Sequence, residues 1–254
     1  MIELDTIIGI KTATAVDVNN LLVPSNSLAA HLRQYSEPAL FHSDGAGKYH
    51  MSLSGSLFRA RFNDRYFVFV SRHQMTLGNY EHDQIALLNY DKKTLVTSHR
   101  AVFPDNASDE YDCAVYEFTD LIKSGKLPAT SWYDLKTDWV RDHLPKPNLV
   151  VAIGYPGHRN SIDYEAAHYG ASPNAVWGVE ASPVIDGRLS FVPKPEILFE
   201  PAGMSGCPVF GCSLDNLAPT CFFAGILTNA TQNRFNFFSF SRMRPLLERL
   251  LASG

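Results

Sequence analysis

The amino-acid sequence predicts an all-β fold, because short apolar runs recur along its 254 residues while helix signals are few. The runs are about 5 to 7 residues long, are rich in β-branched and aromatic residues, and are bounded by Gly, Pro, Asn and Asp. No repeat or low-complexity tract interrupts them, so the pattern favours β-barrels or a β-sandwich over solenoids and propellers. The predicted strands are residues 56–62, 66–71, 85–90, 114–118, 149–153 and 222–227.

Turn and cap residues predict how several elements begin and end. Residues 63–65, Asn-Asp-Arg, predict a hairpin turn between the first two strands, because Asn and Asp tolerate the required backbone angles. Residues 25–27 can cap a short helix that ends at Leu32. Ser241 can cap a clearer helix over residues 242–252, whose apolar side chains fall on one face. We therefore expect a C-terminal helix to close the chain.

The composition excludes two classes of partner. The net charge is -4, from 22 basic and 26 acidic residues, and no segment gathers Lys or Arg as phosphate binding requires. We therefore expect no nucleic-acid partner. No run of about 18 apolar residues is present, and residues 1–5 lack the basic leader of a secretion signal. We expect no membrane partner and a cytoplasmic location.

The cysteines and histidines predict neither disulfides nor a metal site. Cys113, Cys207, Cys212 and Cys221 are few for this length, and a chain kept inside the cell normally holds its thiols reduced. Their spacing matches no zinc template, and the nine histidines include no helical His-x-x-x-His pair. We expect no metal and no cofactor.

A serine held between glycines is the first candidate for chemistry. Residues 203–206 are Gly-Met-Ser-Gly, and glycines let a backbone turn approach a substrate closely. Such a turn can aim the amides of Gly203 and Ser205 at one point, where they would stabilise the oxyanion of a tetrahedral intermediate. Taken alone, a turn of this kind is more often structural. Ser205 therefore needs a base and an orienting carboxylate as partners.

His73 and Asp112 are the candidate partners of Ser205. A buried-type strand over residues 66–70 delivers His73 at its end, and histidine suits the role of a base at neutral pH. Asp112 stands directly before another apolar strand, where burial would be costly for an unpaired charge. The three residues together form a more specific pattern than any one of them.

The order His, Asp, Ser and the motifs around these residues resemble the trypsin and chymotrypsin-like serine proteases. The motifs are a strand that ends in His73, Asp-Cys-Ala-Val from Asp112, and Gly-Met-Ser-Gly-Cys-Pro-Val over residues 203–209. Further segments that resemble strands of the family are residues 55–58, 150–156 and 224–229. The resemblance runs from about residue 55 to the terminal helix and leaves the first fifty residues unexplained.

The resemblance implies a serine endopeptidase whose substrate is a polypeptide. It also implies two antiparallel Greek-key β-barrels of the chymotrypsin-like kind, with His73 and Asp112 on the first and Ser205 on the second. The implied domains are residues 1–125 for the N-terminal region and first barrel, 126–147 for a connection, 148–240 for the second barrel and 241–254 for the terminal helix.

Asp83 is a rival to Asp112 for the carboxylate, because it too precedes an apolar strand. It lies only ten residues after His73, which leaves too little chain for the intervening strands of a barrel. Asp112 lies 39 residues after His73, which leaves enough. The spacing favours Asp112.

The resemblance also implies where a substrate side chain would bind. The walls of the family's specificity pocket correspond to the residues just before the nucleophile turn and to Thr228, Asn229 and Ala230. Phe199 stands where the family fixes basic specificity, which disfavours selection of Arg or Lys. A one-residue shift would place Glu200 there instead, so the cleaved residue stays open.

Departures from the family change the expected regulation. Met204 precedes the nucleophile where many secreted members carry an aspartate, and the Ile-Val-Gly-Gly start is missing. Activation by zymogen cleavage is therefore not expected. Residues 1–50 stay open as a regulatory cover, as extra strands of the first barrel or as the contact site of a regulatory partner.

Two other classes of protein compete with a protease. A catalytically silent scaffold that keeps the protease fold and binds peptides would share the same motifs. A serine esterase of the α/β-hydrolase kind also uses a Gly-x-Ser-x-Gly turn, but that fold places Ser before Asp and His. Ser205 follows both candidate partners and alternating strand-helix units are missing, so the esterase is disfavoured.

Overall fold

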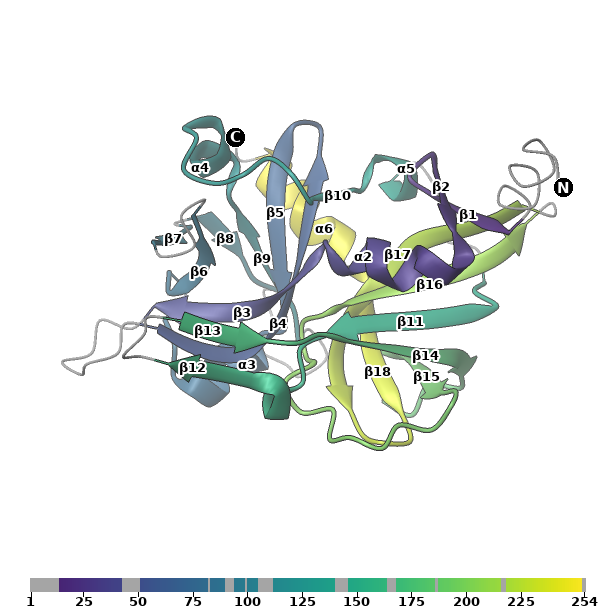
Figure 1. Cartoon of the computed structure of the whole chain (residues 1–254). Helices are drawn as coiled ribbons and strands as arrows, with labels where there is room; N and C mark the ends of the chain where they lie inside the picture. The colour runs from purple at the N-terminus through teal and green to yellow at the C-terminus, as the bar shows by residue number, and fades with distance from the viewer. Residues whose placement is uncertain are drawn as a thin grey trace, which may run out of the picture.

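The computed structural model describes residues 14–42, 51–81, 83–89, 94–98, 100–104, 112–139, 146–163, 168–185, 187–215 and 218–252. These residues form two β-barrels, one open and one closed, and a C-terminal helix (Figure 1). The predicted fold class is therefore confirmed.

The first barrel is an open sheet with the strand order β7-β6-β3-β4-β5-β9-β8. β4 and β5 form the predicted hairpin, and Asn63 and Asp64 at its tip have φ of 49° and 58°. A two-residue turn that follows the strand twist needs positive φ at both positions, which Asn and Asp tolerate. The strands are β3 (Ser36–His42), β4 (Met51–Phe62), β5 (Arg65–Val70), β6 (Ile85–Leu88), β7 (Leu95–Thr97), β8 (Arg100–Val102) and β9 (Ala114–Glu117).

The second barrel is closed, because β16 pairs with both β11 and β17. The order around it is β16-β11-β14-β15-β18-β17, and all of these pairs are antiparallel. A separate hairpin, β12 (Asn160–Asp163) and β13 (His168–Ala171), leaves the barrel after β11. The barrel strands are β11 (Leu149–Gly154), β14 (Asn174–Ala181), β15 (Leu189–Pro193), β16 (Pro208–Asp215), β17 (Ala218–Ala230) and β18 (Phe235–Ser239).

An aromatic core joins the two barrels. Phe58 of β4 stacks on Phe223 of β17 with ring centroids 4.2 Å apart, and Phe69 of β5 lies 6.0 Å from the same ring of Phe223. All three side chains are fully buried. Burial of each such ring contributes about 1.5 to 3 kcal/mol, so the apolar faces of these strands hold the barrels together.

The N-terminal segment crosses from the second barrel to the first. β1 (Ala15–Val18) and β2 (Leu21–Pro24) extend the second barrel, because β1 pairs in parallel with β17. The chain then forms η1 (Ser25–Ser27) and α2 (Leu28–Arg33) before β3 enters the first barrel. The predicted division placed residues 1–125 with the first barrel, but Val16, Val18 and Val23 are buried in the core that the barrels share. Burial of these three valines stabilises β1 and β2 against the second barrel before the chain enters the first.

The connection after the first barrel carries short elements of its own. They are α4 (Thr119–Lys123), β10 (Tyr133–Asp134) and α5 (Lys136–Trp139). β10 pairs in parallel with β4, so part of the predicted connection over residues 126–147 packs onto the first barrel.

The C-terminal helix α6 (Phe240–Ala252) packs against both barrels. It contacts β8 and β9 of the first barrel and β17 and β18 of the second. It begins two residues before the predicted start. Its buried residues include the predicted apolar face, Met243, Leu246, Leu247 and Leu250.

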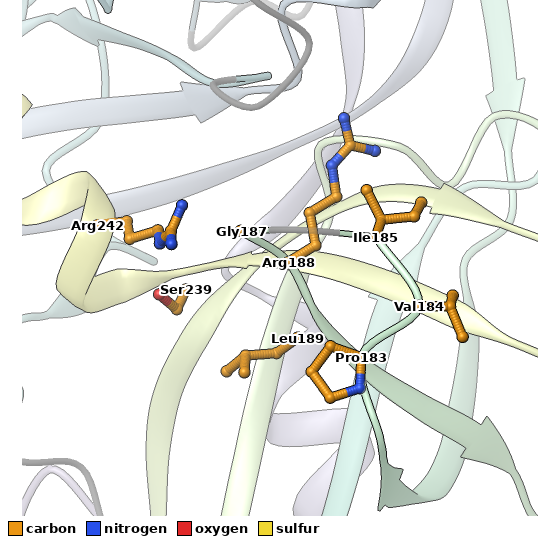
Figure 2. Close-up of a pocket in the computed structure, with 8 residues that line it drawn as sticks. All are labelled: Pro183, Val184, Ile185, Gly187, Arg188, Leu189, Ser239 and Arg242. Atoms are coloured by element: carbon orange, nitrogen blue, oxygen red, sulfur yellow. The ribbon is translucent and has the colours of Figure 1, made fainter.

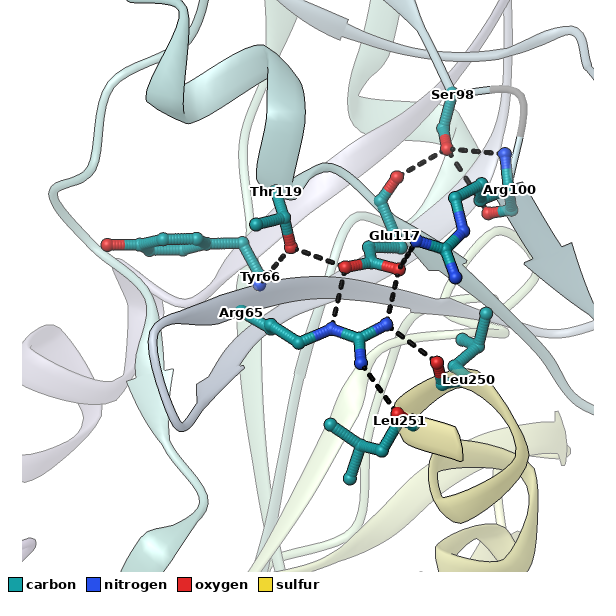
Figure 3. A network of polar contacts seen from close by, with 8 residues as sticks. All are labelled: Arg65, Tyr66, Ser98, Arg100, Glu117, Thr119, Leu250 and Leu251. Carbon is teal, nitrogen blue, oxygen red and sulfur yellow. Dashed lines mark hydrogen bonds and ion pairs between the residues drawn. The ribbon is translucent and has the colours of Figure 1, made fainter. Parts of the chain in front are cut away.

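A charged network ties the end of α6 to the first barrel (Figure 3). Arg65 donates through Nε and Nη2 to the two carboxylate oxygens of Glu117, at 2.8 and 2.7 Å. The same guanidinium donates to the carbonyls of Leu250 and Leu251, at 2.6 and 3.1 Å. Carbonyls in the last turn of a helix lack intrahelical donors, so Arg65 caps α6. Thr119 also donates to Glu117, at 2.7 Å.

Candidate active site

Two paired strands bring His73 and Asp112 together. β5 pairs with β9 so that Val70 lies opposite Ala114, and the chain segments just beyond this pair carry His73 and Asp112. His73 is the first residue of α3 (His73–Gly78), the short helix that follows β5. Its Nδ1 lies 2.6 Å from Asp112 Oδ2, and its backbone amide donates to Asp112 Oδ1 at 2.8 Å. Both carboxylate oxygens therefore contact His73.

Ser71 is a third member of this cluster that the sequence analysis missed. Its hydroxyl donates to Asp112 Oδ2 at 2.7 Å and lies 2.7 Å from His73 Nδ1. The Ser71 side chain is fully buried, so this contact is shielded from water. A hydroxyl residue two positions before a candidate histidine was the available signal.

The surroundings of Asp112 keep it ionised. Asp112 is only 8% exposed, and burial by itself raises the pKa of its carboxyl. The hydrogen bond and charge of His73, the Ser71 hydroxyl and the His73 amide outweigh burial, so the pKa of Asp112 is lowered. The carboxylate is charged at neutral pH and can orient an imidazole.

The turn that carries Ser205 requires its glycines. Gly203 and Gly206 have φ of 93° and 82°, a region that side-chain-bearing residues avoid. A Cβ at Gly203 would lie 2.6 Å from the amide nitrogen of Gly157, and one at Gly206 would lie 2.1 Å from the Ser56 carbonyl oxygen. Only glycine fits at both positions.

Two residues of the first barrel hold this turn in place. The Ser56 amide donates to the Ser205 carbonyl at 2.9 Å, and the Ser56 hydroxyl donates to the Gly203 carbonyl at 3.0 Å. The side-chain amide of Gln74 also donates to the Ser205 carbonyl, and to the Ser56 carbonyl at 3.1 Å. No sequence motif marks Ser56 or Gln74 for this role, and the only signals in the sequence are their positions beside Gly55 and His73.

The turn presents two free amides. Among the described residues, the amides of Gly203 and Ser205 have no hydrogen-bond acceptor. The amide of Met204 between them donates to Pro201 at 3.0 Å. Both donors are therefore available to an acceptor from outside the turn, which is a condition for binding an oxyanion.

The hydroxyl of Ser205 does not contact His73. It donates to the carbonyl of Thr228 at 3.1 Å, and no hydrogen bond to His73 is present among the described side chains. The side chains of Ser205 and His73 are both partly exposed, with 35% of the His73 side chain accessible. Asp112 is therefore bonded to His73, and Gln74, the next residue along the chain, is bonded to the Ser205 turn. The Ser205 hydroxyl itself points toward Thr228.

The residues predicted to form a specificity pocket are divided between core and surface. Phe199 is partly buried and lies 5.8 Å from the ring of His158, whereas Glu200 is exposed. The Thr228 hydroxyl is buried and donates to the Asn236 carbonyl at 3.1 Å. Asn229 is exposed, and its side-chain oxygen accepts a hydrogen bond from Asn236 at 2.6 Å. Ala230 is partly buried against the core of the second barrel.

The rival carboxylate and two surface hollows lie away from His73 and Ser205. Asp83 is exposed, and among the described contacts it makes none with His73. A hollow of about 390 Å³ lies between the loop after β14 and the start of α6, with Arg242 on one side (Figure 2). A second hollow of about 450 Å³ lies between α2, β3 and β13. His73 and Ser205 line neither of them.

No His, Cys, Asp and Glu cluster of three or more that could hold a metal ion occurs in the part of the chain that the structure describes. All four cysteines are free thiols. No helix within the described ranges has the length and apolar character needed to cross a membrane.

No protein-family model matches this sequence, and a search of the curated proteins finds no match.

Proposed function

We propose that this protein is a serine endopeptidase that hydrolyses polypeptides with Ser205 as nucleophile, His73 as base and Asp112 as orienting carboxylate. The observation that carries the proposal is the double contact of Asp112 with the Nδ1 and the backbone amide of His73. Occupation of Nδ1 by Asp112 leaves Nε2 of His73 as the nitrogen that accepts a proton.

The proposed reaction proceeds through an acyl-enzyme. Ser205 attacks the peptide carbonyl while His73 accepts the hydroxyl proton, and His73 then donates that proton to the leaving amine. Water then attacks the acyl-enzyme with His73 again as the proton acceptor and donor, and this step releases the acyl group. Asp112 holds the imidazole in one tautomer and stabilises its cationic form. The amides of Gly203 and Ser205 stabilise the oxyanion, and removal of one such donor typically costs about 100- to 1000-fold in rate.

The proposed reaction requires one rotation of the Ser205 side chain. Its hydroxyl must leave the Thr228 carbonyl and turn toward His73 Nε2. Catalytic hydrogen bonds are often long or misaligned before substrate binds, so this resting position is compatible with activity. A substrate backbone that pairs with β17 near Thr228 would compete for the same carbonyl and release the hydroxyl.

The proposal also covers the substrate side chain that is preferred and the cellular compartment of the protein. Phe199, Thr228, Asn229 and Ala230 would line the pocket for the substrate side chain, with Glu200 at its rim. Phe199 disfavours basic side chains. We place the protein in the cytoplasm, where its four free thiols stay reduced.

A catalytically silent peptide-binding scaffold is the second candidate. The hydrogen bond from Ser205 to Thr228 favours it, because it holds the hydroxyl away from the base.

A regulatory partner that binds through residues 1–50 also stays a prediction. Residues 36–42 of that segment form β3, which lies between β4 and β6. Deletion of all fifty residues would therefore remove a central strand, so it is a poor test of regulation.

Reaction with a fluorophosphonate probe, followed by intact mass, tests the proposal. The wild-type protein should gain one adduct, because the probe reacts only with an activated serine. Ser205→Ala and His73→Ala should gain none. Ser161→Ala, which changes an exposed serine of β12, is the matched control and should react like the wild type.

A folded wild-type protein that gains no adduct and still binds peptides would identify the silent scaffold. An adduct that persists in Ser205→Ala would show that the nucleophile is assigned to the wrong residue. Digestion of a peptide library would then define the pocket of an active enzyme.

A further inference from the structure

Two of the four cysteines face each other across a strand pair. In the β16–β17 ladder Cys212 lies directly opposite Cys221. Residues directly opposite in an antiparallel pair have Cα atoms about 4.5 or 5.5 Å apart, depending on the type of pair. Both values lie within the range of about 4.4 to 6.8 Å that a disulfide bridges. The backbone therefore already has the spacing of a disulfide.

The surrounding ladder is regular. The neighbouring pairs are Gly211 with Phe222 and Ser213 with Thr220, so no bulge shifts the register at Cys212. Cys221 also lies opposite Val18 of the parallel strand β1, which gives it a neighbouring strand on each side. The two thiols are held opposite each other by these paired strands.

The two thiols differ in exposure and in acidity. Cys212 is partly exposed, whereas Cys221 is 4% exposed. A hydrogen bond with Cys221 lowers the pKa of the Cys212 thiol, and the same hydrogen bond together with burial raises the pKa of Cys221. Because the thiolate is the reactive form, Cys212 is the thiol that meets an oxidant first and Cys221 is the thiol that resolves it.

The other two cysteines have the opposite character. Cys113 and Cys207 are fully buried, and burial raises the pKa of both thiols. Among the described strand pairs neither lies opposite another cysteine. They serve as internal controls, since all four thiols belong to the same folded chain.

We propose that Cys212 and Cys221 form a peroxide-sensitive modification site that closes into an intrachain disulfide. The Cys212 thiolate attacks one oxygen of hydrogen peroxide, breaks the O–O bond, and becomes a sulfenic acid while hydroxide leaves. The Cys221 sulfur then attacks the Cys212 sulfur, and the sulfenic oxygen leaves as water with the proton of Cys221. Two thiols and one peroxide yield one disulfide and two waters, so the chain loses two electrons.

The disulfide links strands that are already paired, so little movement is needed. The ladder joins Pro208 to Ile226 at its other end, near the turn of Ser205, and Cys212 and Cys221 lie four ladder positions beyond them. We therefore expect oxidation to leave the Ser205 turn in place. The cross-link restricts the unfolded chain and should raise the unfolding midpoint by about 5 °C.

Thiol counting and peptide mapping of the full chain test this site. The reduced protein is treated with hydrogen peroxide, denatured, alkylated and cleaved before Asp215 with endoproteinase Asp-N, which separates the two cysteines in sequence. The free thiols should fall from four to two, and the peptides that carry Cys212 and Cys221 should stay joined until a reductant is added.

Three variants make the outcome decisive. Cys212→Ser and Cys221→Ser should form no linked peptides, whereas Cys207→Ala should still form them. Four free thiols after peroxide, or a linked pair that contains Cys113 or Cys207, would overturn the proposal. The Asp-N peptide that carries Cys212 also carries Cys207, so the wild-type digest is cleaved further with chymotrypsin after Phe210, which separates these two cysteines. The resulting wild-type map decides the matter even where a variant folds poorly, and it does so whether or not Ser205 is catalytic.

Discussion

The side chain of Gln74 and the backbone carbonyl of Ser205 are joined by a hydrogen bond across the two barrels. Gln74 follows His73 directly in α3, so the residue next to the candidate base holds the turn of the candidate nucleophile. The same amide also donates to Ser56 at 3.1 Å. Gln74 is 2% exposed, so neither bond is exchanged for water at low cost. It is a positioning residue between the two halves of the site.

Replacement of Gln74 should slow reaction at Ser205. Gln74→Ala removes two buried hydrogen bonds and lets the turn shift, and a displacement of about 1 Å in a catalytic group costs about 100-fold. We expect the rate of fluorophosphonate labelling to fall by about 10- to 100-fold while the protein still unfolds cooperatively. Gln34→Ala, which changes a glutamine outside the site, should label normally. A Gln74→Ala protein that labels at the wild-type rate would mean that the Ser56 backbone bond alone holds the turn.

Replacement of Ser71 should make stability less dependent on acid pH. The pKa of Asp112 is lowered in the folded protein, so its ionisation contributes stability that is present above the unfolded pKa and is lost as pH falls through the folded pKa. Ser71→Ala removes one donor to the carboxylate and raises the folded pKa of Asp112. The free energy of unfolding should fall by about 1 to 2 kcal/mol at neutral pH.

Urea unfolding at neutral and acid pH measures this effect. The difference between Ser71→Ala and the wild type should shrink once Asp112 is protonated, whereas Ser161→Ala should match the wild type throughout. A difference of constant size at every pH would assign Ser71 a packing role only.

The two candidate carboxylates make opposite predictions. Asp112→Asn keeps the shape of the side chain but removes the charge and favours the wrong tautomer of His73, which should cost about 10⁴-fold in turnover. Asp83→Asn should change turnover little, because Asp83 is exposed and apart from His73. Peptidase assays of the two variants compare them directly. Loss of turnover in Asp83→Asn with retention in Asp112→Asn would reverse the assignment.

Gly203 should be far less replaceable than Gly125. Both have positive φ, 93° and 74°, but a Cβ at Gly125 meets nothing within 4 Å, whereas one at Gly203 meets the Gly157 amide at 2.6 Å. Gly125→Ala therefore reports the backbone strain alone, about 1 to 2 kcal/mol. Gly203→Ala adds a clash and displaces a free amide, so labelling should also fall by about 100-fold. Equal behaviour of the two variants would remove the proposed role of the Gly203 amide.

Local chemistry explains why much of the fold was predictable. The hairpin at Asn63 and Asp64 follows from residues that accept positive φ, and α6 follows from one apolar face. The placement of β1 was not predictable in this way. Asp17 and Val18 pair with Thr220 and Cys221 in β17, and no local pattern encodes a contact over so long a stretch of chain.

The residues of the candidate site were likewise predictable only where a local sequence pattern marks them. His73, Asp112 and Ser205 were recognisable because their order and flanking strands form a sequence pattern. Ser71 and Gln74 were missed, because an isolated polar residue is ordinary until the fold buries it beside a charge or a turn. The orientation of the Ser205 hydroxyl toward Thr228 depends on side-chain rotation, which no sequence motif specifies.

The Arg65–Glu117 network gives the last prediction (Figure 3). The Glu117 side chain is 4% exposed and contacts Arg65 at 2.7 Å and Arg100 at 3.2 Å. Burial raises the pKa of Glu117, but the hydrogen bond of Arg65 and the nearby charges outweigh it and lower that pKa. Its stabilisation is therefore present above the unfolded pKa and lost as pH falls through the folded pKa.

Glu117→Gln should lower the free energy of unfolding at neutral pH by about 3 kcal/mol, because it leaves the largely buried Arg65 without its ionic partner. Arg65 also caps α6 through Leu250 and Leu251, so the loss should appear first as faster amide hydrogen exchange at the end of that helix. Glu248 is the matched control. Its contact with Arg244 on α6 is exposed, and Glu248→Gln should cost less than about 0.5 kcal/mol. Equal losses in the two variants would mean that the buried network contributes no more than a surface ion pair.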